Sequence, residues 1–351
     1  MNSLFRSSPR GALALSFSLS LSLLLASTTV GARAAASNQA AAASDWIAPD
    51  HVPFAEFIVQ SHRGAGVLAE ENTVHAFEVG WGLGTYPESD LRTTSDGVIV
   101  TFHDDNFSRV VKGVTPELAH KGVKDLTYAE LMKLDVGSWK GDQFVGRRIS
   151  KLSDAFAAMQ GHPERHLYLD IKNVDFPKLA DEVRAAHVEK QIVLASPKPE
   201  QLVAWKKLVP ESETLLWMRG GDRVLRAKIE KLRKVNFAGI TQLQIHIFPN
   251  RTLDQAMTIA GTTVEKLGIS ADAAKNSSEP FTPSSSFIVE LGRELRSHHI
   301  LFQTLPYTDD TGVYAPLLDL GVMSFATDHP DVTMREIKAY YERHQAKSVA
   351  H

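Results

Sequence analysis

Short apolar segments alternate with amphipathic helical segments along most of this chain of 351 residues. Helical patterns occupy residues 73–81, 176–187, 199–208 and 222–235, each between two apolar segments. The apolar segments predict strands over residues 57–60, 85–91, 98–102, 166–171, 191–195, 214–218, 238–243, 300–304 and 322–327. Strands that alternate with helices over such a length predict a parallel sheet covered by helices.

One predicted strand differs from the others because it follows its predecessor through a hairpin. Residues 98–102 come directly after Asp96-Gly97, a strong hairpin signal. We therefore expect an antiparallel arm there, which leaves eight strands, the number of a closed (β/α)8 TIM-type barrel. A doubly wound open sheet is the alternative, but no Gly-x-Gly-x-x-Gly pattern follows an early strand.

Two stretches do not fit the alternation. Residues 105–150 contain little strand pattern, so we expect a small insertion of loops and short helices after strand two. Residues 270–286 are polar, with several serines and two prolines, and predict a surface loop.

The first 34 residues have the pattern of a secretory signal peptide. Arg6 and Arg10 precede an apolar run over residues 13–26, and Ala32-Arg33-Ala34 offers small residues for cleavage. The run is short for a membrane span, which needs about 20 residues, and an uncleaved anchor is the alternative. We expect a signal peptide over 1–34, a flexible lead-in over 35–50, a barrel over 51–345, and a secreted or periplasmic mature protein without a stable membrane span.

The composition excludes several classes of function. The 38 basic and 41 acidic side chains leave a net charge of -3, which gives no basic excess for general nucleic-acid binding. The chain has no cysteine, which excludes a disulfide scaffold, a thiol nucleophile, a zinc ribbon and an iron–sulfur cluster.

Three carboxylates occur at the ends of two predicted strands. Glu88 and Asp90 share one side of their strand because side chains alternate along it, and Asp170 and Lys172 share a side of the next. Functional groups collect at the carboxyl ends of barrel strands, so we expect these carboxylates to converge. Their mutual repulsion would raise their pKa values or leave their charge uncompensated unless a cation lies among them, and oxygen ligands suit one divalent cation, Ca²⁺ or Mg²⁺.

Two histidines also follow predicted strands. His62 and Arg63 come directly after the first strand, and His103 follows the hairpin arm. Two imidazoles beside a cation can act as general acid and base, while Arg63 and Lys172 add positive charge. This mixture of groups suits a phosphate ester as substrate.

Each of these groups has a purely structural alternative. The histidines can serve only as hydrogen-bonding residues, Asp170 and Lys172 as an ion pair, and Arg63 as a clamp on a loop carbonyl. Glu71-Asn72-Thr73 contains residue types that cap helices. The remaining histidines without recurring partners are interpreted as surface or packing residues: His75, His120, His162, His246, His298 and His299.

Taken together, the order and spacing of these motifs resemble the signature of the glycerophosphodiester phosphodiesterases. The resemblance covers roughly residues 57–335. The matching segments are Ser61-His62-Arg63-Gly64, Glu71-Asn72-Thr73, Glu88-Ser89-Asp90, Asp96-Gly97, His103-Asp104-Asp105, residues 124–131, Leu169-Asp170-Ile171-Lys172 and Thr327-Asp328-His329-Pro330.

This resemblance implies a (β/α)8 barrel that cleaves glycerophosphodiesters to glycerol 3-phosphate and an alcohol with one divalent cation. It implies that His62 and His103 form the acid–base pair. It also implies a role for each charged residue: metal ligation by Glu88, Asp90 and Asp170, and phosphate binding by Arg63 with Lys172 beside it. In the implied reaction a neighbouring substrate hydroxyl attacks phosphorus, and water then opens the cyclic phosphate.

The chain departs from the family pattern in four places. Glu70 replaces the usual proline before Glu-Asn-Thr, and Asp170 is one methylene shorter than the usual glutamate ligand. Residues 302–304 replace a usual Trp-Thr pair, and residues 323–326 contain a bulky Met and Phe. The last two changes bear on substrate identity more than on reaction type.

Three functional hypotheses follow. The first is an exported metal-dependent phosphodiesterase acting on small glycerophosphodiesters. The second is a phospholipase-D-like or cyclising lyase in contact with lysolipids, which would expose apolar residues of the insertion such as Phe107, Trp139 and Phe144. The third is a catalytically silent binding barrel, which is disfavoured because both histidines and all three carboxylates are present.

Overall fold

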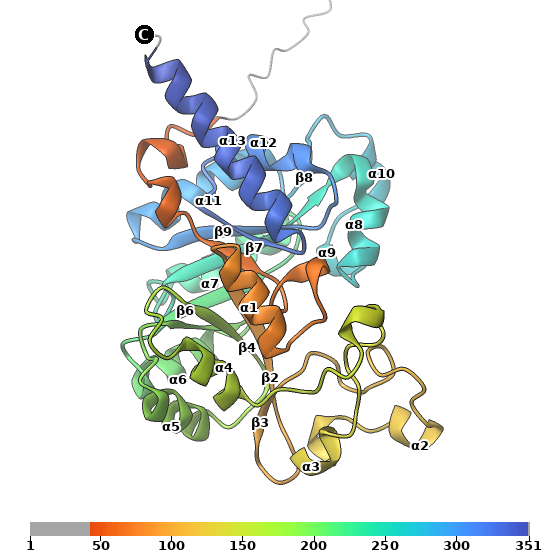
Figure 1. Ribbon diagram of the computed structural model, residues 1–351. Coiled ribbons are helices and arrows are strands. Elements are labelled where there is room, and N and C mark those ends of the chain that lie inside the picture. The colour runs from red at the N-terminus through yellow and green to blue at the C-terminus, as the bar shows by residue number, and fades with distance from the viewer. Residues whose placement is uncertain (1–42, 350–351) are drawn as a thin grey trace, which may run out of the picture. The chain divides into compact units, whose positions relative to one another are not determined.

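Eight parallel strands close into a barrel in the computed structural model, which describes residues 43–349 (Figure 1). The barrel strands are β1 (Val59–Ser61), β2 (Tyr86–Thr93), β4 (Leu167–Asn173), β5 (Ile192–Ser196), β6 (Glu213–Met218), β7 (Gln242–Pro249), β9 (Leu301–Pro306) and β10 (Ser324–Thr327). They follow one another around the barrel in this order. Ser61 closes it, because its backbone pairs with Pro87 of β2 on one side and with Thr327 of β10 on the other. The predicted TIM-type barrel is confirmed, and the open sheet is excluded.

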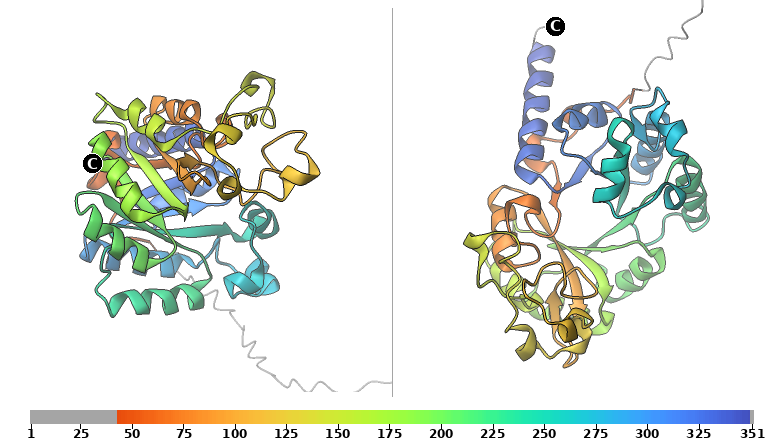
Figure 2. Two further views of the ribbon diagram at one scale, coloured as in Figure 1. Left: turned by 90° about the horizontal axis from the view of Figure 1, so that it is seen from below. Right: turned by 90° about the vertical axis from the view of Figure 1, so that its right-hand side faces the viewer.

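Helices cover the outside of the barrel and follow its strands along the chain (Figure 2). They are α1 (Val74–Gly82), α4 (Leu152–Met159), α5 (Phe176–Ala186), α6 (Pro199–Leu208), α7 (Asp222–Arg233), α11 (Ser285–Ser297), α12 (Tyr314–Asp319) and α13 (Pro330–Val349). No helix within residues 43–349 is long and apolar enough to cross a membrane.

Alternation along β4 explains how this fold positions polar groups. Leu167, Leu169 and Ile171 belong to the large apolar cluster that joins the strands to the helices. The intervening residues, among them Asp170, face the interior of the barrel. One register therefore sets both the packing of the helices and the direction of the charged side chains.

The seventh strand begins later than the sequence pattern suggested. The prediction placed it over residues 238–243, whereas β7 spans Gln242–Pro249. Residues 236–239 form a turn with positive φ at three positions, which ends the connection from α7. The pattern was misread because Gln244 and His246 interrupt the apolar run where side chains point into the barrel.

The predicted hairpin arm and insertion are confirmed. β3 (Ile99–Thr101) pairs antiparallel with β2 outside the barrel. The insertion contains α2 (Pro116–Ala119) and α3 (Tyr128–Leu131) and lies beside β2 and β3 in Figure 1. It has an apolar cluster of its own, formed by Val100, Phe102, Phe107, Val110, Val111, Val123, Leu126, Leu131, Val136 and Ile149.

Glu70, the substitution for the family's proline, ties this insertion to the barrel. Its side chain is fully buried and accepts hydrogen bonds from the Thr73 hydroxyl at 2.7 Å and from His75 Nδ1 at 3.1 Å. Arg147 of the insertion forms an ion pair with the same carboxylate at 3.4 Å. Glu70 therefore connects the loop between β1 and α1 to the insertion.

The segment between β7 and α11 is more structured than a loop. It contains α8 (Leu253–Ile259), α9 (Val264–Leu267), α10 (Ala271–Lys275) and β8 (Phe281–Thr282). β8 pairs antiparallel with the end of β7, and Phe281 is buried. The prediction of a surface loop over 270–286 was wrong, because this stretch contains α10 and the buried strand β8. A strand of two residues is too short to produce a periodic pattern in the sequence.

The predicted signal peptide and the first half of the lead-in, residues 35–42, lie outside the described residues. Within the lead-in, the backbone N–H of Ser44 donates to the Asp319 carbonyl at 3.1 Å, and Ala48 is fully buried. The chain is thus in contact with the barrel before residue 51.

Candidate active site

The seven residues singled out from the sequence lie together at the carboxyl ends of neighbouring strands. His62 and Arg63 follow β1, Glu88 and Asp90 lie on β2, His103 follows β3, and Asp170 and Lys172 lie on β4. All except Asp90 line one cavity of about 610 Å³, and Asp90, which is 1% exposed, is paired with Lys172 of that lining. The prediction that these groups converge at the mouth of the barrel is confirmed.

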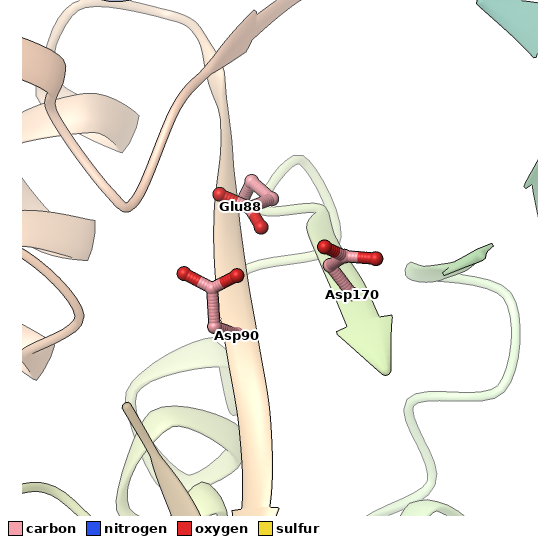
Figure 3. Close-up of side chains that lie close together, drawn as sticks. All are labelled: Glu88, Asp90 and Asp170. Carbon is pink, nitrogen blue, oxygen red and sulfur yellow. The ribbon is translucent and has the colours of Figure 1, made fainter. Parts of the chain in front are cut away.

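Three carboxylates form the floor of this site. Glu88, Asp90 and Asp170 are almost fully buried, and each offers an oxygen within 4.8 Å of those of the other two (Figure 3). Asp90 and Asp170 are direct partners in the pairing of β2 with β4. The adjacent strands therefore hold the oxygen atoms in an arrangement that could accept a metal ion.

Lys172 compensates part of this negative charge in the structure. Its Nζ lies 2.9 Å from Asp90 Oδ1 and 2.5 Å from Asp170 Oδ2. Burial opposes ionisation of the lysine, but the surrounding carboxylates outweigh it and raise the pKa of Lys172. The other oxygen of Asp170 accepts a hydrogen bond from Trp217 Nε1 at 3.2 Å. Both oxygens of Asp170 are therefore engaged by the chain itself.

The two carboxylates on β2 differ in their tendency to ionise. Burial, followed by the negative charge of Asp90, raises the pKa of Glu88 to about 8. Burial also opposes ionisation of Asp90, but the nearby cations, Lys172 first, outweigh it and hold the pKa of Asp90 well below its usual range. A further cation near Glu88 would lower the pKa of this group and favour its carboxylate form.

Asn72 holds Asp90 in place. Its Nδ2 donates to Asp90 Oδ2 at 2.8 Å, and its Oδ1 accepts from the backbone N–H of Asp90 at the same distance. Asn72 has a φ of 56°, a backbone conformation that asparagine tolerates better than most residues. Thr73 caps α1 as the sequence suggested, but Asn72 serves the carboxylate instead.

Arg63 joins the loop after β1 to the acidic floor. Its backbone N–H donates to Glu88 Oε2 at 2.7 Å, and its Nη1 donates to Glu71 Oε2 at 3.2 Å. Its Nε lies 4.0 Å from the nearest oxygen of Asp90 and, within the described chain, has no hydrogen-bond partner although it is buried. Arg63 also has a φ of 53°, an uncommon conformation that is stable only where its surroundings hold it.

His62 is oriented by Asp328, which follows β10. Asp328 Oδ1 lies 2.6 Å from His62 Nδ1. Burial lowers the pKa of His62, but the carboxylate outweighs burial and holds that pKa above its ordinary value. Burial opposes ionisation of Asp328, but the imidazole, its hydrogen bond and the nearby cations outweigh burial and lower the pKa of Asp328 to about 2. Gly66 permits this arrangement, because a Cβ there would lie 2.0 Å from the Asp328 carbonyl oxygen.

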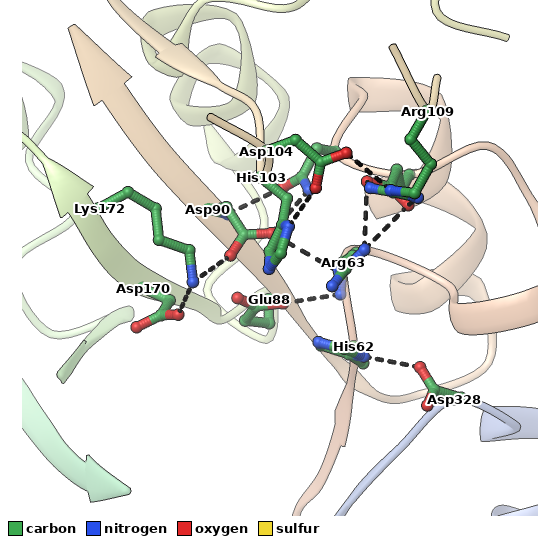
Figure 4. Close-up of polar contacts among 12 residues, drawn as sticks. His62, Arg63, Glu88, Asp90, His103, Asp104, Arg109, Asp170, Lys172 and Asp328 are labelled. Atoms are coloured by element: carbon green, nitrogen blue, oxygen red, sulfur yellow. Dashed lines mark hydrogen bonds and ion pairs between the residues drawn. The ribbon is translucent and has the colours of Figure 1, made fainter. Parts of the chain in front are cut away.

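His103 is oriented in the same way by its neighbour in sequence. Asp104 Oδ1 lies 2.6 Å from His103 Nδ1, and Arg109 Nε donates to the other oxygen of Asp104 at 2.7 Å. Arg109 also binds Glu71 through both terminal nitrogens, at 2.8 and 2.5 Å. Glu71 thus connects the guanidinium groups of Arg63 and Arg109, and the network links the start of the insertion to the acidic floor (Figure 4).

Each of the two imidazoles has one nitrogen engaged by a carboxylate and one nitrogen free of hydrogen bonds within the described chain. In Figure 4 each carboxylate partner lies on the side of its ring that faces away from Glu88. With Nδ1 engaged, Nε2 is the atom left for a substrate, and no residue in the described part of the chain hydrogen-bonds to Nε2 of His62 or His103. Two such rings beside a cation site can supply an acid and a base in one reaction.

Sequence reasoning missed several residues of this site. Asp328 and Asp104 stood within the quoted motifs, but only the fold reveals that they orient the histidines. His246, interpreted as a surface or packing residue, does pack on Trp217 and Tyr307, yet it also lines the cavity. Because side chains alternate along a strand, His246 faces the same side as Gln244, and this spacing could have indicated that both point into the barrel.

We predict that Asp328→Asn lowers the pKa of His62 in metal-free protein, because burial and Arg63 then act without the opposing carboxylate. Proton NMR titration of the imidazole measures this shift. Since the pKa of folded His62 is raised, its contribution to stability is complete below about pH 6.5, the unfolded value. That contribution is lost as the pH rises through the folded value. Asp309→Asn, which removes the partner of His329, is the control, and an unchanged pKa of His62 in Asp328→Asn would disprove the pairing.

Comparisons with known proteins point to one family. The family model described as "Glycerophosphoryl diester phosphodiesterase family" matches residues 62–332. A glycerophosphodiester phosphodiesterase of Bacillus subtilis is 24% identical over 311 residues, which are 86% of this chain and 92% of that protein. Another, from Caldanaerobacter subterraneus, is 31% identical over 160 residues, which are 44% of this chain and 63% of that protein.

Solved structures share the fold. A phosphodiesterase from Oleispira antarctica, in complex with the product sn-glycerol-3-phosphate, is 24% identical and gives a TM-score of 0.54, with 80% of this chain and 96% of that chain covered. A protein from Silicibacter pomeroyi gives a TM-score of 0.58 at 21% identity, with coverages of 81% and 93%. With the family match over most of the barrel, these findings establish that this chain belongs to the glycerophosphodiester phosphodiesterase family of phosphoric diester hydrolases.

Proposed function

We propose that this chain is a metal-dependent enzyme in which His62 and His103 act as the acid–base pair for hydrolysis of glycerophosphodiesters to glycerol 3-phosphate and an alcohol. The observation that carries the proposal is the pairing of each imidazole with its own carboxylate, beside three buried carboxylates at the mouth of the barrel. Family membership supports the reaction class.

The acidic floor fits one divalent cation. Glu88, Asp90 and Asp170 provide oxygen atoms alone, as Ca²⁺ and Mg²⁺ prefer, and a single lysine leaves their charge incompletely balanced. The short Asp170 side chain is the third ligand in this proposal, although its oxygens are shared with Lys172 and Trp217. When bound, the cation supplies positive charge that stabilises the negative charge developing on the phosphoryl oxygens.

The residues of the chain perform the remaining steps. One imidazole accepts the proton of a substrate hydroxyl next to the phosphate, and the other donates a proton to the leaving alkoxide. The buried Nε of Arg63, which lacks a partner in the described structure, is available to a phosphate oxygen. Water then opens the cyclic phosphate with the two histidine roles exchanged. Lys172 adds positive charge on the opposite side of the floor.

The lysolipid alternative receives little support from the three aromatic residues of the insertion on which it depended. Phe107 and Phe144 of the insertion are buried in apolar clusters rather than exposed to lipid. Trp139 lines the cavity, but the cationic groups of Arg109 and Lys140 lie over its ring at 5.5 and 5.6 Å. The insertion therefore offers the cavity a mixed aromatic and cationic wall, which suits a small polar substrate better than a lysolipid chain.

We predict that His62→Ala and His103→Ala each reduce turnover by about 10²-fold or more, the usual effect of losing an acid or base. Phosphorus NMR of products from a panel of glycerophosphodiesters and lysolipids, with Ca²⁺ or Mg²⁺, measures both rate and product. His162→Ala, an exposed histidine outside the cavity, is the control. Near-normal turnover of either variant would remove that residue from the mechanism, and accumulation of a cyclic phosphate would identify a lyase.

We also propose that the protein is exported and that its mature N-terminus lies near Ala35, which the composition of the first 34 residues supports. N-terminal sequencing of protein recovered from the periplasm or medium tests this. Exported protein that still begins at Met1 would contradict cleavage.

A further inference from the structure

The cavity extends beyond the catalytic groups to a wall that the proposed reaction does not use. This distal wall consists of Trp217 at the end of β6, Arg219 just beyond it, His246 of β7, Tyr307 after β9, and residues 259–261. Trp217 also donates to Asp170, so the distal wall begins directly beside the acidic floor. A phosphodiester held at the floor can therefore place one of its two arms against it.

The aromatic part of the wall is rigid and uncharged. The His246 ring stacks on Trp217 with centroids 5.4 Å apart and meets the edge of Tyr307 at 5.2 Å. Burial, followed by the positive charge of Arg219, lowers the pKa of His246 to about 3, so the imidazole is neutral at physiological pH. It does not supply a charge for a ligand.

Buried hydrogen bonds fix this neutral ring in one tautomer. Gln244 donates through Nε2 to Gln303 Oε1 at 2.5 Å, which leaves its Oε1 as an acceptor. His246 Nε2, at 3.2 Å, must then carry the proton that Gln244 Oε1 accepts. His246 Nδ1 is left to accept from the Tyr307 hydroxyl at 3.3 Å. The ring is therefore held as part of the wall and cannot serve as a further acid or base.

The charged part of the wall is Arg219. Its Nη1 donates to the Ala260 carbonyl at 3.1 Å, and it forms no ion pair with any carboxylate in the part of the chain that the structure describes. Lys228 Nζ donates to the Arg219 carbonyl at 2.9 Å, and burial together with Arg219 lowers the pKa of Lys228. Positive charge is thus concentrated at this end of the cavity.

The acidic groups that line the cavity already have partners. Glu71 binds two guanidinium groups, and Asp328 binds His62. Glu88 and Asp170 belong to the floor. A cationic alcohol placed at the distal wall would meet the charge of Arg219, which no carboxylate pairs with in the described structure, whereas an anion there would gain a charged hydrogen bond.

Resting on the proposed function, we propose that Arg219 selects glycerophosphodiesters whose alcohol carries an additional anionic group, a phosphate or a carboxylate. The glycerol arm is neutral in every substrate of this class. With the scissile phosphate held at the floor as proposed, the remaining source of an opposite charge for Arg219 is an anionic group on the alcohol arm, placed against the distal wall. The selection is a specificity effect, since Arg219 does not contact the reacting groups that we assign.

The test compares kcat/KM for four diesters: glycerophosphoglycerol, its derivative with a terminal phosphate, glycerophosphoserine and glycerophosphocholine. For the wild type we expect the phosphate-bearing diester to be favoured over glycerophosphoglycerol and glycerophosphocholine to be the poorest. Arg219→Gln should reduce the first ratio about tenfold, the effect of one charged contact. Arg219→Glu should reverse the preference toward glycerophosphocholine, and Arg219→Lys should restore part of the original ratio.

Arg223→Gln, which removes an exposed arginine of α7 outside the cavity, is the matched control. A purely structural role of Arg219 through Ala260 would affect all four diesters alike and would not respond to the sign of the charge. Cleavage of all four with ratios unchanged in Arg219→Gln and Arg219→Glu overturns this inference alone. If the wild type cleaves none of them with Ca²⁺ or Mg²⁺, the proposed function fails and the inference fails with it. If glycerophosphoserine is favoured and the phosphate derivative is not, the preferred anion is a carboxylate.

Discussion

The repulsion among three buried carboxylates is the constraint on which the rest of this site depends. Removing a carboxylate from water costs several kcal/mol unless it is paired, and here three lie within 4.8 Å of one another. Lys172 bridges two of them, Asn72 clamps one by two hydrogen bonds, and the backbone of Arg63 binds the third. Such an arrangement persists only where the fold holds each group in place, and it favours a multivalent cation.

The closed barrel meets this requirement through its register. Because side chains alternate along a strand, the leucines that hold β4 to the helices also turn Asp170 inward. The pairing of Asp90 with Asp170 follows from the same register. Closure between β1 and β10 brings Asp328 next to His62, although 266 residues separate them. Packing of the core and assembly of the site are thus consequences of one pattern.

Much of this arrangement could be predicted from the sequence because periodicity reports local geometry. The eight strands, the antiparallel arm and the seven residues of the site were all predicted from alternation, a hairpin signal and charged residues at strand ends. The boundaries of β7 were wrong because inward-pointing Gln244 and His246 interrupt its apolar run. Polar side chains that point into the barrel near its mouth break the apolar pattern by which a strand is predicted.

Contacts between distant segments could not be predicted in this way. Asn72 is of a residue type that often caps helices, and it becomes a partner of Asp90 only because β2 lies next to it in the fold. Glu70 resembled a detail of a loop, yet it is buried and paired with Arg147 of the insertion. The distal wall combines residues at or beyond the ends of β6 and β9 with His246 of β7 and residues 259–261, and these share no motif. Their function depends on tertiary geometry, which no local pattern encodes.

The proposed mechanism depends on binding of a divalent cation to the acidic floor. Calorimetric titration of Ca²⁺ and Mg²⁺ into chelator-treated protein tests this claim most directly, because it requires no substrate. We expect one site per molecule for the wild type and for Glu211→Gln, which changes an exposed carboxylate outside the cavity. We expect at least tenfold weaker binding for Glu88→Gln, about 1.4 kcal/mol or more. Absence of binding to the wild type, or equal affinity in Glu88→Gln, would contradict a cation site at the acidic floor.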